Sequence, residues 1–311
     1  MRILLIDTTH PSLPALLARA GFELVDGTTW TETEIHNALP EMDGVVIRSR
    51  IPVQDEFFTH AINLKCIGRF GAGLENINLD LAKSKKIVCH NVPKGNRQAV
   101  GEHALALLLN LLNHIRKADS EVRKGVWDRH GNTGTELSGK TVGIIGLGNM
   151  GQSFAKVLGG FDVDIIAYDP YLQHWPANNV RSVSLKELQA SSDIISIHTP
   201  LTEETRGWIN QSFWTEVKKQ VYLINTARGP IVNTEALLDS IREGKVIGAG
   251  LDVLEFESKS FKLNRDSNPI LQELLKSDKV ILSPHVGGWT AEAFQKMGEL
   301  LAQKMIRTLK G

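Results

Sequence analysis

The chain has 311 residues, of which 42% are hydrophobic and 23% charged, with 35 basic and 35 acidic side chains. The balanced charge argues against nucleic acid and anionic membranes as partners, and the length predicts about two domains, each able to bury its own core. The only cysteines, Cys66 and Cys89, offer no disulfide framework, so we expect a cytoplasmic protein.

The first 90 residues alternate short apolar runs with amphipathic runs. We expect strands at 3–6, 23–25, 44–48, 66–68 and 87–89, and helices at 13–20, 32–39, 55–61 and 79–83. The first apolar run is too short for the hydrophobic region of a signal peptide. The alternation predicts a parallel sheet with helices on both faces and ligands beyond the carboxyl ends of its strands.

Two of these strands end in segments suited to an anion. The residues are Arg48 and Ser49 after one strand, and Arg69, Gly71, Ala72 and Gly73 after the next. A glycine-rich turn lets backbone N–H groups converge, and arginine adds charge and a planar set of donors. The pattern predicts an anion site, and two surface arginines beside a flexible turn are the structural alternative.

A long helix is expected next. Pro, Gly and Asn residues at 91–97 predict a crossing loop, and a helix should run from about Gln98 to about Lys124 with a break near Ala118. Its leucines cover more than one face, which is typical of a helix buried within the protein or against another subunit. Polar residues inside the apolar stretch 99–115 argue against a membrane span.

The segment 140–170 has the pattern of a dinucleotide-binding unit. An apolar strand at 141–145 leads into Gly146-x-Gly148-x-x-Gly151, a helical pattern, and a second strand at 164–168 that ends on Asp169. The glycines allow a tight turn, a close approach to a pyrophosphate and close helix packing. Asp169 can accept both ribose hydroxyls and should repel a 2′-phosphate, which favours NAD over NADP. A structural turn without a ligand is the alternative.

Beyond Asp169 the alternation continues. We expect strands at 194–198, 221–225, 247–251 and 280–282, helices at 185–189, 210–217, 234–242 and 291–309, and a polar loop at 258–268. Three residues that follow strands in this region are Arg228, Glu257 and His285. Arg228 can bind a carboxylate, His285 can transfer a proton, and Glu257 can orient the imidazole. Each alone has an ordinary structural explanation, and Glu255 is a rival for Glu257.

These motifs together resemble the D-isomer-specific 2-hydroxyacid dehydrogenases over nearly the whole chain. The resemblance rests on 146–151 with Asp169, on 198–202, 225–229 and 252–257, and on Pro284-His285. It implies an α/β fold with two doubly wound parallel-sheet domains, one flavodoxin-like and one Rossmann, and an active-site cleft between them. The substrate domain would comprise 1–97 plus 286–311, and the NAD-binding domain 98–285 with a dimerisation helix. A homodimer or a dimer of dimers is implied, and no metal.

The resemblance also implies roles for individual residues. Arg228 would bind the substrate carboxylate, His285 would act as acid and base, and Glu257 would be its partner. Asp252 would hold the nicotinamide amide. The residues that would line the NAD site are Gly146, Gly148, Asn149, Met150, Gly151, Asp169, His198, Thr199, Pro200, Thr226, Ala227, Asp252 and Gly287.

Within the family, the chain is most similar to the members that oxidise D-3-phosphoglycerate to 3-phosphohydroxypyruvate in serine biosynthesis. Arg48 and Arg69 would then hold the phosphate and carboxylate, and Arg129 of a neighbouring subunit would add charge. Phe70 departs from the small residue common at its position. Because the chain ends at Gly311, we expect no C-terminal regulatory domain.

Three other functions stay open. A glyoxylate or hydroxypyruvate reductase needs the three catalytic residues but not the two arginines. An NAD(H)-sensing, corepressor-like interaction protein needs only the dinucleotide site. A methyltransferase with the same glycine loop leaves Arg228, Glu257 and His285 unexplained.

Overall fold

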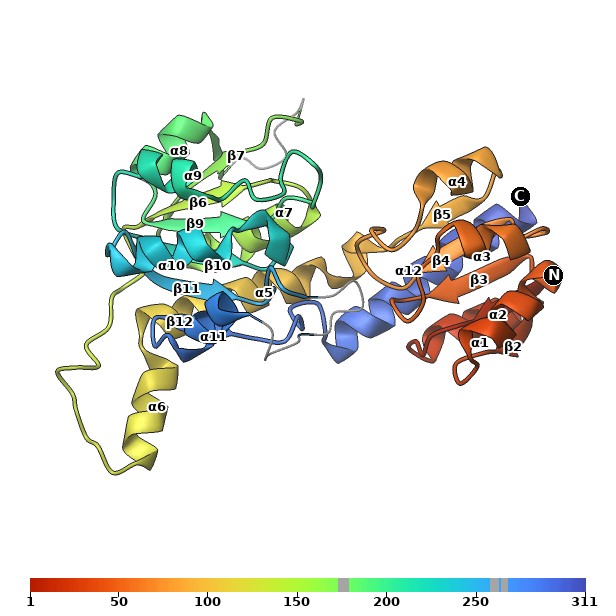
Figure 1. Cartoon of the computed structure of the whole chain (residues 1–311), viewed down its shortest axis with the longest axis horizontal. Helices are drawn as coiled ribbons and strands as arrows, with labels where there is room; N and C mark the ends of the chain where they lie inside the picture. The colour runs from red at the N-terminus through yellow and green to blue at the C-terminus, as the bar shows by residue number, and fades with distance from the viewer. Residues whose placement is uncertain (173–178, 258–262, 264–267) are drawn as a thin grey trace. The chain divides into compact units, whose positions relative to one another are not determined.

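The computed structural model describes residues 1–172, 179–257, 263 and 268–311. The chain divides into two compact units (Figure 1). Of the described residues, the first unit contains Met1–Arg97 and Trp289–Gly311, and the second contains the remainder, from Gln98 to Gly288. The return to the first unit comes at Trp289 rather than at the expected residue 286, because the N–H groups of Val286 and Gly287 are bonded to Asp252 of the second unit.

In its described part, the first unit holds a five-stranded parallel sheet with the order β2-β1-β3-β4-β5. This is the flavodoxin-like order, with a switch point between β1 and β3. The strands are β1 (Arg2–Leu5), β2 (Glu23–Asp26), β3 (Gly44–Ile47), β4 (Cys66–Arg69) and β5 (Val88–His90). The helices are α1 (Ser12–Arg19), α2 (Glu32–Ala38), α3 (Asp55–His60), α4 (Leu79–Ser84) and α12 (Ala291–Lys310), with a 3-10 turn at Leu39–Glu41.

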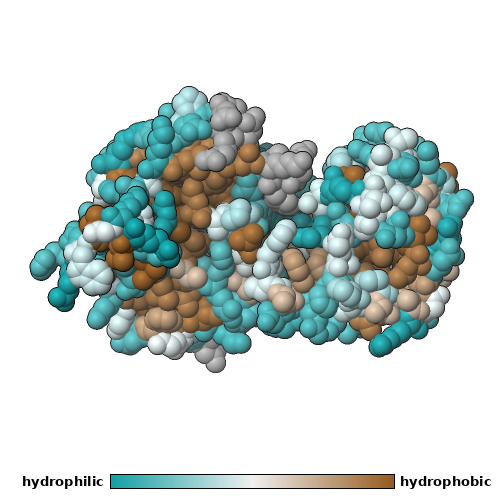
Figure 2. Space-filling view, turned by 90° about the horizontal axis from the view of Figure 1, so that it is seen from below, coloured by the Kyte–Doolittle hydropathy of each residue, from teal (hydrophilic) through white to brown (hydrophobic). Residues whose placement is uncertain are grey.

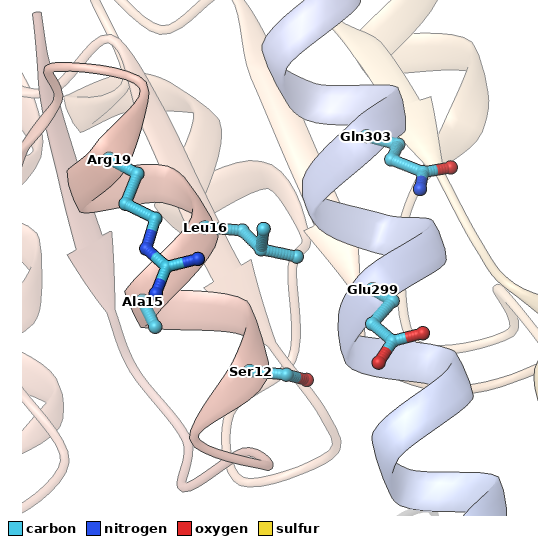
Figure 3. A pocket seen from close by; sticks show the side chains of 6 residues that line it. All are labelled: Ser12, Ala15, Leu16, Arg19, Glu299 and Gln303. Carbon is cyan, nitrogen blue, oxygen red and sulfur yellow. The ribbon is translucent and has the colours of Figure 1, made fainter.

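Helices cover both faces of this sheet. Ile35 of α2 and Phe57 of α3 belong to one buried cluster, whereas Leu13 of α1 and Met305 of α12 belong to another. Helices α1 and α12 lie side by side and line a shallow surface groove of about 400 Å³ (Figure 3). The groove residues, none of which is a predicted site residue, are Ser12, Ala15, Leu16, Arg19, Glu299 and Gln303.

The second unit, within its described residues, holds a seven-stranded parallel sheet with the order β12-β11-β10-β9-β6-β7-β8. Read from β8, this is the Rossmann order with one strand added beyond the sixth. The strands are β6 (Thr141–Ile145), β7 (Asp164–Tyr168), β8 (Arg181–Ser182), β9 (Ile194–Ile197), β10 (Val221–Asn225), β11 (Val246–Leu251) and β12 (Val280–Leu282). The expected α/β class with two doubly wound parallel sheets is confirmed.

The helices of the second unit also lie on both faces of its sheet, except α6, which extends away from it (Figure 1). They are α6 (Ile115–Arg123), α7 (Asn149–Val157), α8 (Leu185–Ser191), α9 (Gln211–Glu216), α10 (Thr234–Arg242) and α11 (Pro269–Lys276), with 3-10 turns at Leu158–Gly160 and Gly229–Ile231. Phe154 of α7 packs in one cluster, and Phe213 of α9 and Leu237 of α10 pack in the other. Strand β8 and helix α11 are absent from the sequence prediction, and most of the expected polar loop at 258–268 lies outside the described residues.

Helix α5 (Pro93–Leu112) corrects two expectations. The expected loop at 91–97 is wrong from Pro93 onward, because proline at the first helical position has a suitable φ and lacks only an N–H that needs no partner there. The expected break near Ala118 is also misplaced. The helix ends at Leu112, whose carbonyl accepts Thr135 N at 2.8 Å, and His114 has a left-handed φ of 51°.

Candidate active site

The glycine turn of the second unit joins β6 to α7. Gly146 has a φ of 88°, which favours glycine, and Gly151 lies against the carbonyl of Gly146, where a side chain would not fit. A Cβ on Gly148 would meet nothing within 4 Å, and this residue caps α7 without any side-chain hydrogen bond. The N–H groups of Asn149 and Met150 therefore begin a helix whose N-terminus offers donors and a positive dipole to an anion.

Asp169 follows β7 and is tied to this turn. Its carboxylate accepts Leu147 N at 2.9 Å and Tyr171 N at 3.0 Å, one on each oxygen. Each carboxylate oxygen can accept a further hydrogen bond, so both remain able to bind hydroxyl groups. The expected role of Asp169 at an adenosine ribose stays a prediction.

The ends of β9 and β10 contribute buried polar atoms without partners. Among the described residues, no hydrogen bond reaches His198 Nδ1, Thr199 Oγ1 or Thr226 Oγ1, although all three atoms are buried. A Cβ on Gly146 would lie 2.9 Å from Thr199 Cγ2, so Thr199 is beside the glycine turn. His198 Nε2 bonds Ser196 Oγ at 2.8 Å, and burial lowers the pKa of His198 to about 3, which keeps this ring neutral.

These features fit a dinucleotide. Buried unpaired hydroxyl groups are costly unless a ligand satisfies them. Thr199 lies after β9, the neighbour of the strand that leads into the glycine turn, and Thr226 lies after β10, the next strand along. The adjoining residues Pro200 and Ala227 complete these two segments, and Gly287 follows β12. Each expected cofactor residue is thus in the turn or after a strand of this sheet.

Arg228 follows β10 and lies close to the end of β11. The next residue, Gly229, packs directly on the carbonyl of Leu254, so close that no Cβ would fit. Arg228 Nη1 donates to Ala227 O at 2.7 Å, and Arg228 O accepts Asn225 Nδ2 at 3.2 Å. The close backbone contact brings the arginine to the segment that contains Glu257.

His285 and Glu257 form a hydrogen-bonded pair. His285 Nδ1 lies 2.7 Å from Glu257 Oε2, and Glu257 Oε1 accepts Leu254 N at 2.5 Å. The rival acid, Glu255, is used elsewhere, since its carboxylate accepts Thr234 N at 2.8 Å at the start of α10. The side chains of His285 and Glu257 are 23% and 14% exposed, so the pair is shielded yet reachable by a small molecule.

Asp252, after β11, is turned toward its own protein. Its carboxylate accepts hydrogen bonds from Ser283 Oγ at 2.6 Å, Val286 N at 2.9 Å and Gly287 N at 2.8 Å, and His103 Nε2 is 3.3 Å away. Burial alone would raise the pKa of Asp252, but these donors outweigh it and lower the pKa below its usual value. The carboxylate therefore stays charged in a buried place.

In the first unit, Arg48 follows β3 and lies among aromatic rings. Its guanidinium carbon is 4.7 Å from the Trp289 ring centroid, 5.3 Å from that of Phe294 and 5.9 Å from that of Phe70. Desolvation lowers its pKa, and the charge of Asp7 opposes this only partly. Within the described residues, the guanidinium makes no hydrogen bond to an acceptor. Its backbone N–H donates to Asp7 Oδ2 at 2.6 Å.

Arg69 ends β4, where its neighbour across the sheet is Ile47, the residue before Arg48. The two arginines therefore lie at the ends of adjacent strands. The Arg69 guanidinium lies directly over Gly71, in the space that a side chain there would fill. Ser49, Ala72 and Gly73 are partly exposed in the same loops, and Ala72 O accepts a hydrogen bond from Asn91 Nδ2.

Sequence reasoning missed four residues of these sites: His103, Ser283, Trp289 and Phe294. His103 and Ser283 reach Asp252 from α5 and from the segment after β12, and only tertiary structure brings them together. Trp289 and Phe294 reach Arg48 from the start of α12. An exposed tryptophan shortly after the candidate catalytic histidine is the one signal that could have been noticed.

Comparison with known proteins gives consistent matches. Residues 105–287 match the family model described as D-isomer specific 2-hydroxyacid dehydrogenase, NAD binding domain. D-3-phosphoglycerate dehydrogenase of Archaeoglobus fulgidus is 36% identical over 313 residues, which cover 100% of this chain but 58% of that protein. Hydroxypyruvate reductase of Thermotoga maritima is 40% identical over 276 residues, which cover 89% of this chain and 88% of that protein.

Solved structures agree with these matches. D-2-hydroxyisocaproate dehydrogenase superposes with a TM-score of 0.85 at 28% identity and covers 99% of this chain and 97% of its own. D-lactate dehydrogenase from Aquifex aeolicus, complexed with NAD and lactic acid, superposes with a TM-score of 0.84 at 27% identity and covers 100% and 96%. The chain thus covers nearly the whole of these two structures and little more than half of the D-3-phosphoglycerate dehydrogenase of Archaeoglobus fulgidus.

Proposed function

Because the chain belongs to the D-isomer specific 2-hydroxyacid dehydrogenase family and its second unit is an NAD-binding domain, we propose that it interconverts a D-2-hydroxy acid and its 2-keto acid with NAD. The observation that carries the proposal is the 2.7 Å contact between His285 Nδ1 and Glu257 Oε2. It places a histidine with an oriented ring after a strand of the same sheet that carries the glycine turn.

The roles follow from the chemistry of the side chains. Arg228 binds the substrate carboxylate, which fixes C2 of the substrate and polarises the adjacent carbonyl. Glu257 occupies Nδ1 of His285, so Nε2 takes the proton of the 2-hydroxyl during oxidation and returns it to the carbonyl oxygen during reduction. Glu257 also favours the charged imidazolium that forms. NAD, when bound, accepts or supplies the hydride.

For the substrate, we propose D-3-phosphoglycerate and 3-phosphohydroxypyruvate. Arg48 supports this choice, because a partly desolvated guanidinium without an acceptor among the described residues suits a strongly charged anion. Arg69 lies on the adjacent strand and adds positive charge. The match to D-3-phosphoglycerate dehydrogenase over 100% of this chain also supports it.

A reductase of hydroxypyruvate or glyoxylate is the second candidate. Hydroxypyruvate reductase of Thermotoga maritima and glyoxylate reductase of Thermofilum pendens match at 40% and 38% identity, and the matches cover 88% and 81% of their lengths. Such an enzyme needs His285, Glu257 and Arg228 but gains little from Arg48.

A panel of 2-keto acids, followed by the loss of NADH absorbance, tests both candidates. We expect 3-phosphohydroxypyruvate to have a kcat/KM at least about tenfold above those of hydroxypyruvate and glyoxylate, because a charged hydrogen bond is worth about 1.5–3 kcal/mol. Equal values would favour the reductase. NADH binding without turnover of any keto acid would favour an interaction protein that senses NAD(H).

We further propose that the chain forms a homodimer, or a dimer of dimers, through α5 and α6. Helix α6 extends away from the sheet of its unit and buries none of its side chains (Figure 1). Ile115 and Val122 of α6 are 56% and 51% exposed, and Trp127 beyond it is 78% exposed. Figure 2, seen from below relative to Figure 1, shows hydrophobic residues at the surface of the second unit. Light scattering should give a dimer mass or a multiple, and Ile115→Glu with Val122→Glu should give a monomer.

The two cysteines support the proposed cytoplasmic location. Both are free, and they point to opposite faces of the first sheet, since Cys66 packs in the cluster of α1 and α12 and Cys89 against that of α2 and α3. Burial raises the pKa of Cys66 to about 12 and that of Cys89 to about 11, so neither is a reactive thiolate. No helix of the described residues is long and apolar enough to cross a membrane.

A further inference from the structure

The carboxylate of Asp252, after β11, is buried and accepts several hydrogen bonds. Its side chain is 3% exposed, and its donors come from two parts of the chain. Ser283 Oγ, Val286 N and Gly287 N belong to the segment after β12, and His103 Nε2 belongs to α5. A buried charge is tolerated when it is hydrogen-bonded on several sides, so these donors stabilise the carboxylate and are themselves held by it.

Three of those donors flank His285, the proposed general acid and base, in the sequence. His285 lies between Ser283 and Val286, and its own N–H donates to Asp252 O at 2.8 Å. His285 has a φ of 56°, a left-handed conformation that costs energy for a residue other than glycine. Such a conformation persists only if surrounding contacts enforce it. Asp252 supplies these contacts before, at and after His285.

His103 completes the arrangement from outside the segment. Its Nε2 lies 2.8 Å from Ser283 Oγ and 3.3 Å from Asp252 Oδ1, and Ser283 Oγ lies 2.6 Å from the same Asp252 oxygen. The three side chains thus form a closed set of contacts. Through it, α5 is joined to the segment that carries His285.

We propose that His103, Ser283 and Asp252 form a positioning cluster that holds the His285 imidazole against Glu257. The proposal rests on the proposed function for its effect on turnover. It gives Asp252 a structural task toward His285 in addition to the contact with the cofactor that the family resemblance implies. His103 and Ser283 both contact the carboxylate of Asp252, so they act on His285 through Asp252 and the backbone.

The test compares His103→Ala with His103→Gln in the full-length protein. Alanine removes the Nε2 donor without weakening a helix interior, and glutamine offers an amide donor at a similar distance from the backbone. In the cofactor-free protein, the Nδ1–H resonance of His285 should be visible by NMR, because its hydrogen bond to Glu257 protects it from exchange. We expect His103→Ala to weaken or broaden this resonance and His103→Gln to restore it.

Kinetics supplies the second measurement. We expect His103→Ala to lower kcat about tenfold, by loss of one charged hydrogen bond, and to leave the Kd of NADH within about twofold. Ser283→Ala should likewise lower kcat and leave the Kd of NADH nearly unchanged. A Kd that rises as much as kcat falls would instead mean that His103 and Ser283 act on the bound cofactor and not on His285, and the proposal would be overturned.

Two further outcomes separate the proposals. If the wild-type protein turns over no 2-keto acid, the proposed function fails, but the His285 resonance still tests the cluster. If His103→Ala lowers only the melting temperature and leaves the resonance and kcat unchanged, the cluster is structural and the positioning role is wrong.

Discussion

The strand ends of the two units hold their charged side chains in opposite ways. After β11 and β12, Glu257, His285 and Asp252 are bonded to one another's segments at 2.5–2.9 Å. After β3, the guanidinium of Arg48 lies over ring faces, at 4.7–5.9 Å from their centroids, and makes no hydrogen bond to the described residues. The first set is fixed by the protein, whereas the second leaves hydrogen-bond donors for a ligand.

This difference matches the two tasks that we propose. Proton transfer needs an imidazole whose angle and tautomer are set before the substrate arrives, because a small displacement costs much of the rate. Recognition of a strongly hydrated anion gains from donors that have no competing acceptor. The aromatic rings hold the Arg48 cation in place without using those donors.

Replacement of His285 should have the largest effect. His285→Asn keeps a residue type that tolerates a left-handed backbone and removes the proton-transferring nitrogen. We expect kcat for the preferred keto acid to fall about 10³-fold, within the usual range for general acid–base catalysis. The Kd of NADH, measured by fluorescence, should stay within about threefold. A kcat within about tenfold of the wild type would remove His285 from the mechanism.

Glu257 and Glu255 offer a matched pair. Glu257→Gln replaces the carboxylate that faces His285 Nδ1, so the imidazolium loses its stabilising charge and kcat should fall about 10²-fold. Glu255→Gln alters only the acceptor of Thr234 N, which should cost about 1 kcal/mol of stability and leave kcat unchanged. Equal losses of kcat in the two variants would contradict the distinction.

Arg48 tests the open set. Arg48→Met keeps much of the side-chain length but removes the charge, and we expect it to lower kcat/KM for 3-phosphohydroxypyruvate about 30-fold and that for glyoxylate less than about twofold. Trp289→Leu removes one of the rings that contact the guanidinium, so it should lower kcat/KM for 3-phosphohydroxypyruvate about threefold. Arg50→Met is the control, because Arg50 is bonded to the carbonyls of Trp30 and Gly27. An equal loss of kcat/KM for all substrates would mean that Arg48 does not recognise the phosphate.

Much of the fold could be predicted because it rests on local patterns. Strands buried on both faces read as apolar runs, and the observed bounds of β10 and α10 equal those predicted from sequence. The errors lie where chain-distant contacts decide. Helix α5 starts at Pro93 and ends at Leu112, where the distant Thr135 caps its last carbonyl. No spacing within 91–124 contains that information.

The residues of the candidate site likewise divide into those that local patterns reveal and those that distant contacts decide. Gly146, Asp169, Arg228 and His285 could be found because each follows a predicted strand, and parallel strands bring their carboxyl ends to one edge. Spacing alone does not decide between Glu257 and Glu255, because both follow β11, and the family resemblance implied Glu257. The structure separates the two acids, because Glu257 faces His285 and Glu255 accepts Thr234 N. The bonds of Asp252 to His103 and Ser283 likewise depend on α5 and β12 meeting in space.

The last and smallest effect concerns the pH dependence of stability, through His198. Burial lowers the pKa of His198 from 6.5 to about 3, so the folded protein resists a proton that the unfolded chain accepts. The stabilisation is present in full above pH 6.5 and is lost as the pH falls toward 3. His198→Gln retains a group able to bond Ser196 but does not titrate. When the pH falls from 6.5 to 4.5, the unfolding free energy of the wild type should therefore drop by about 1–2 kcal/mol more than that of His198→Gln. His130→Gln, at an exposed position, should behave as the wild type in urea unfolding at each pH. Parallel pH curves for His198→Gln and the wild type would mean that His198 is protonated within the fold, and the neutral ring assigned to the β9 end would be wrong.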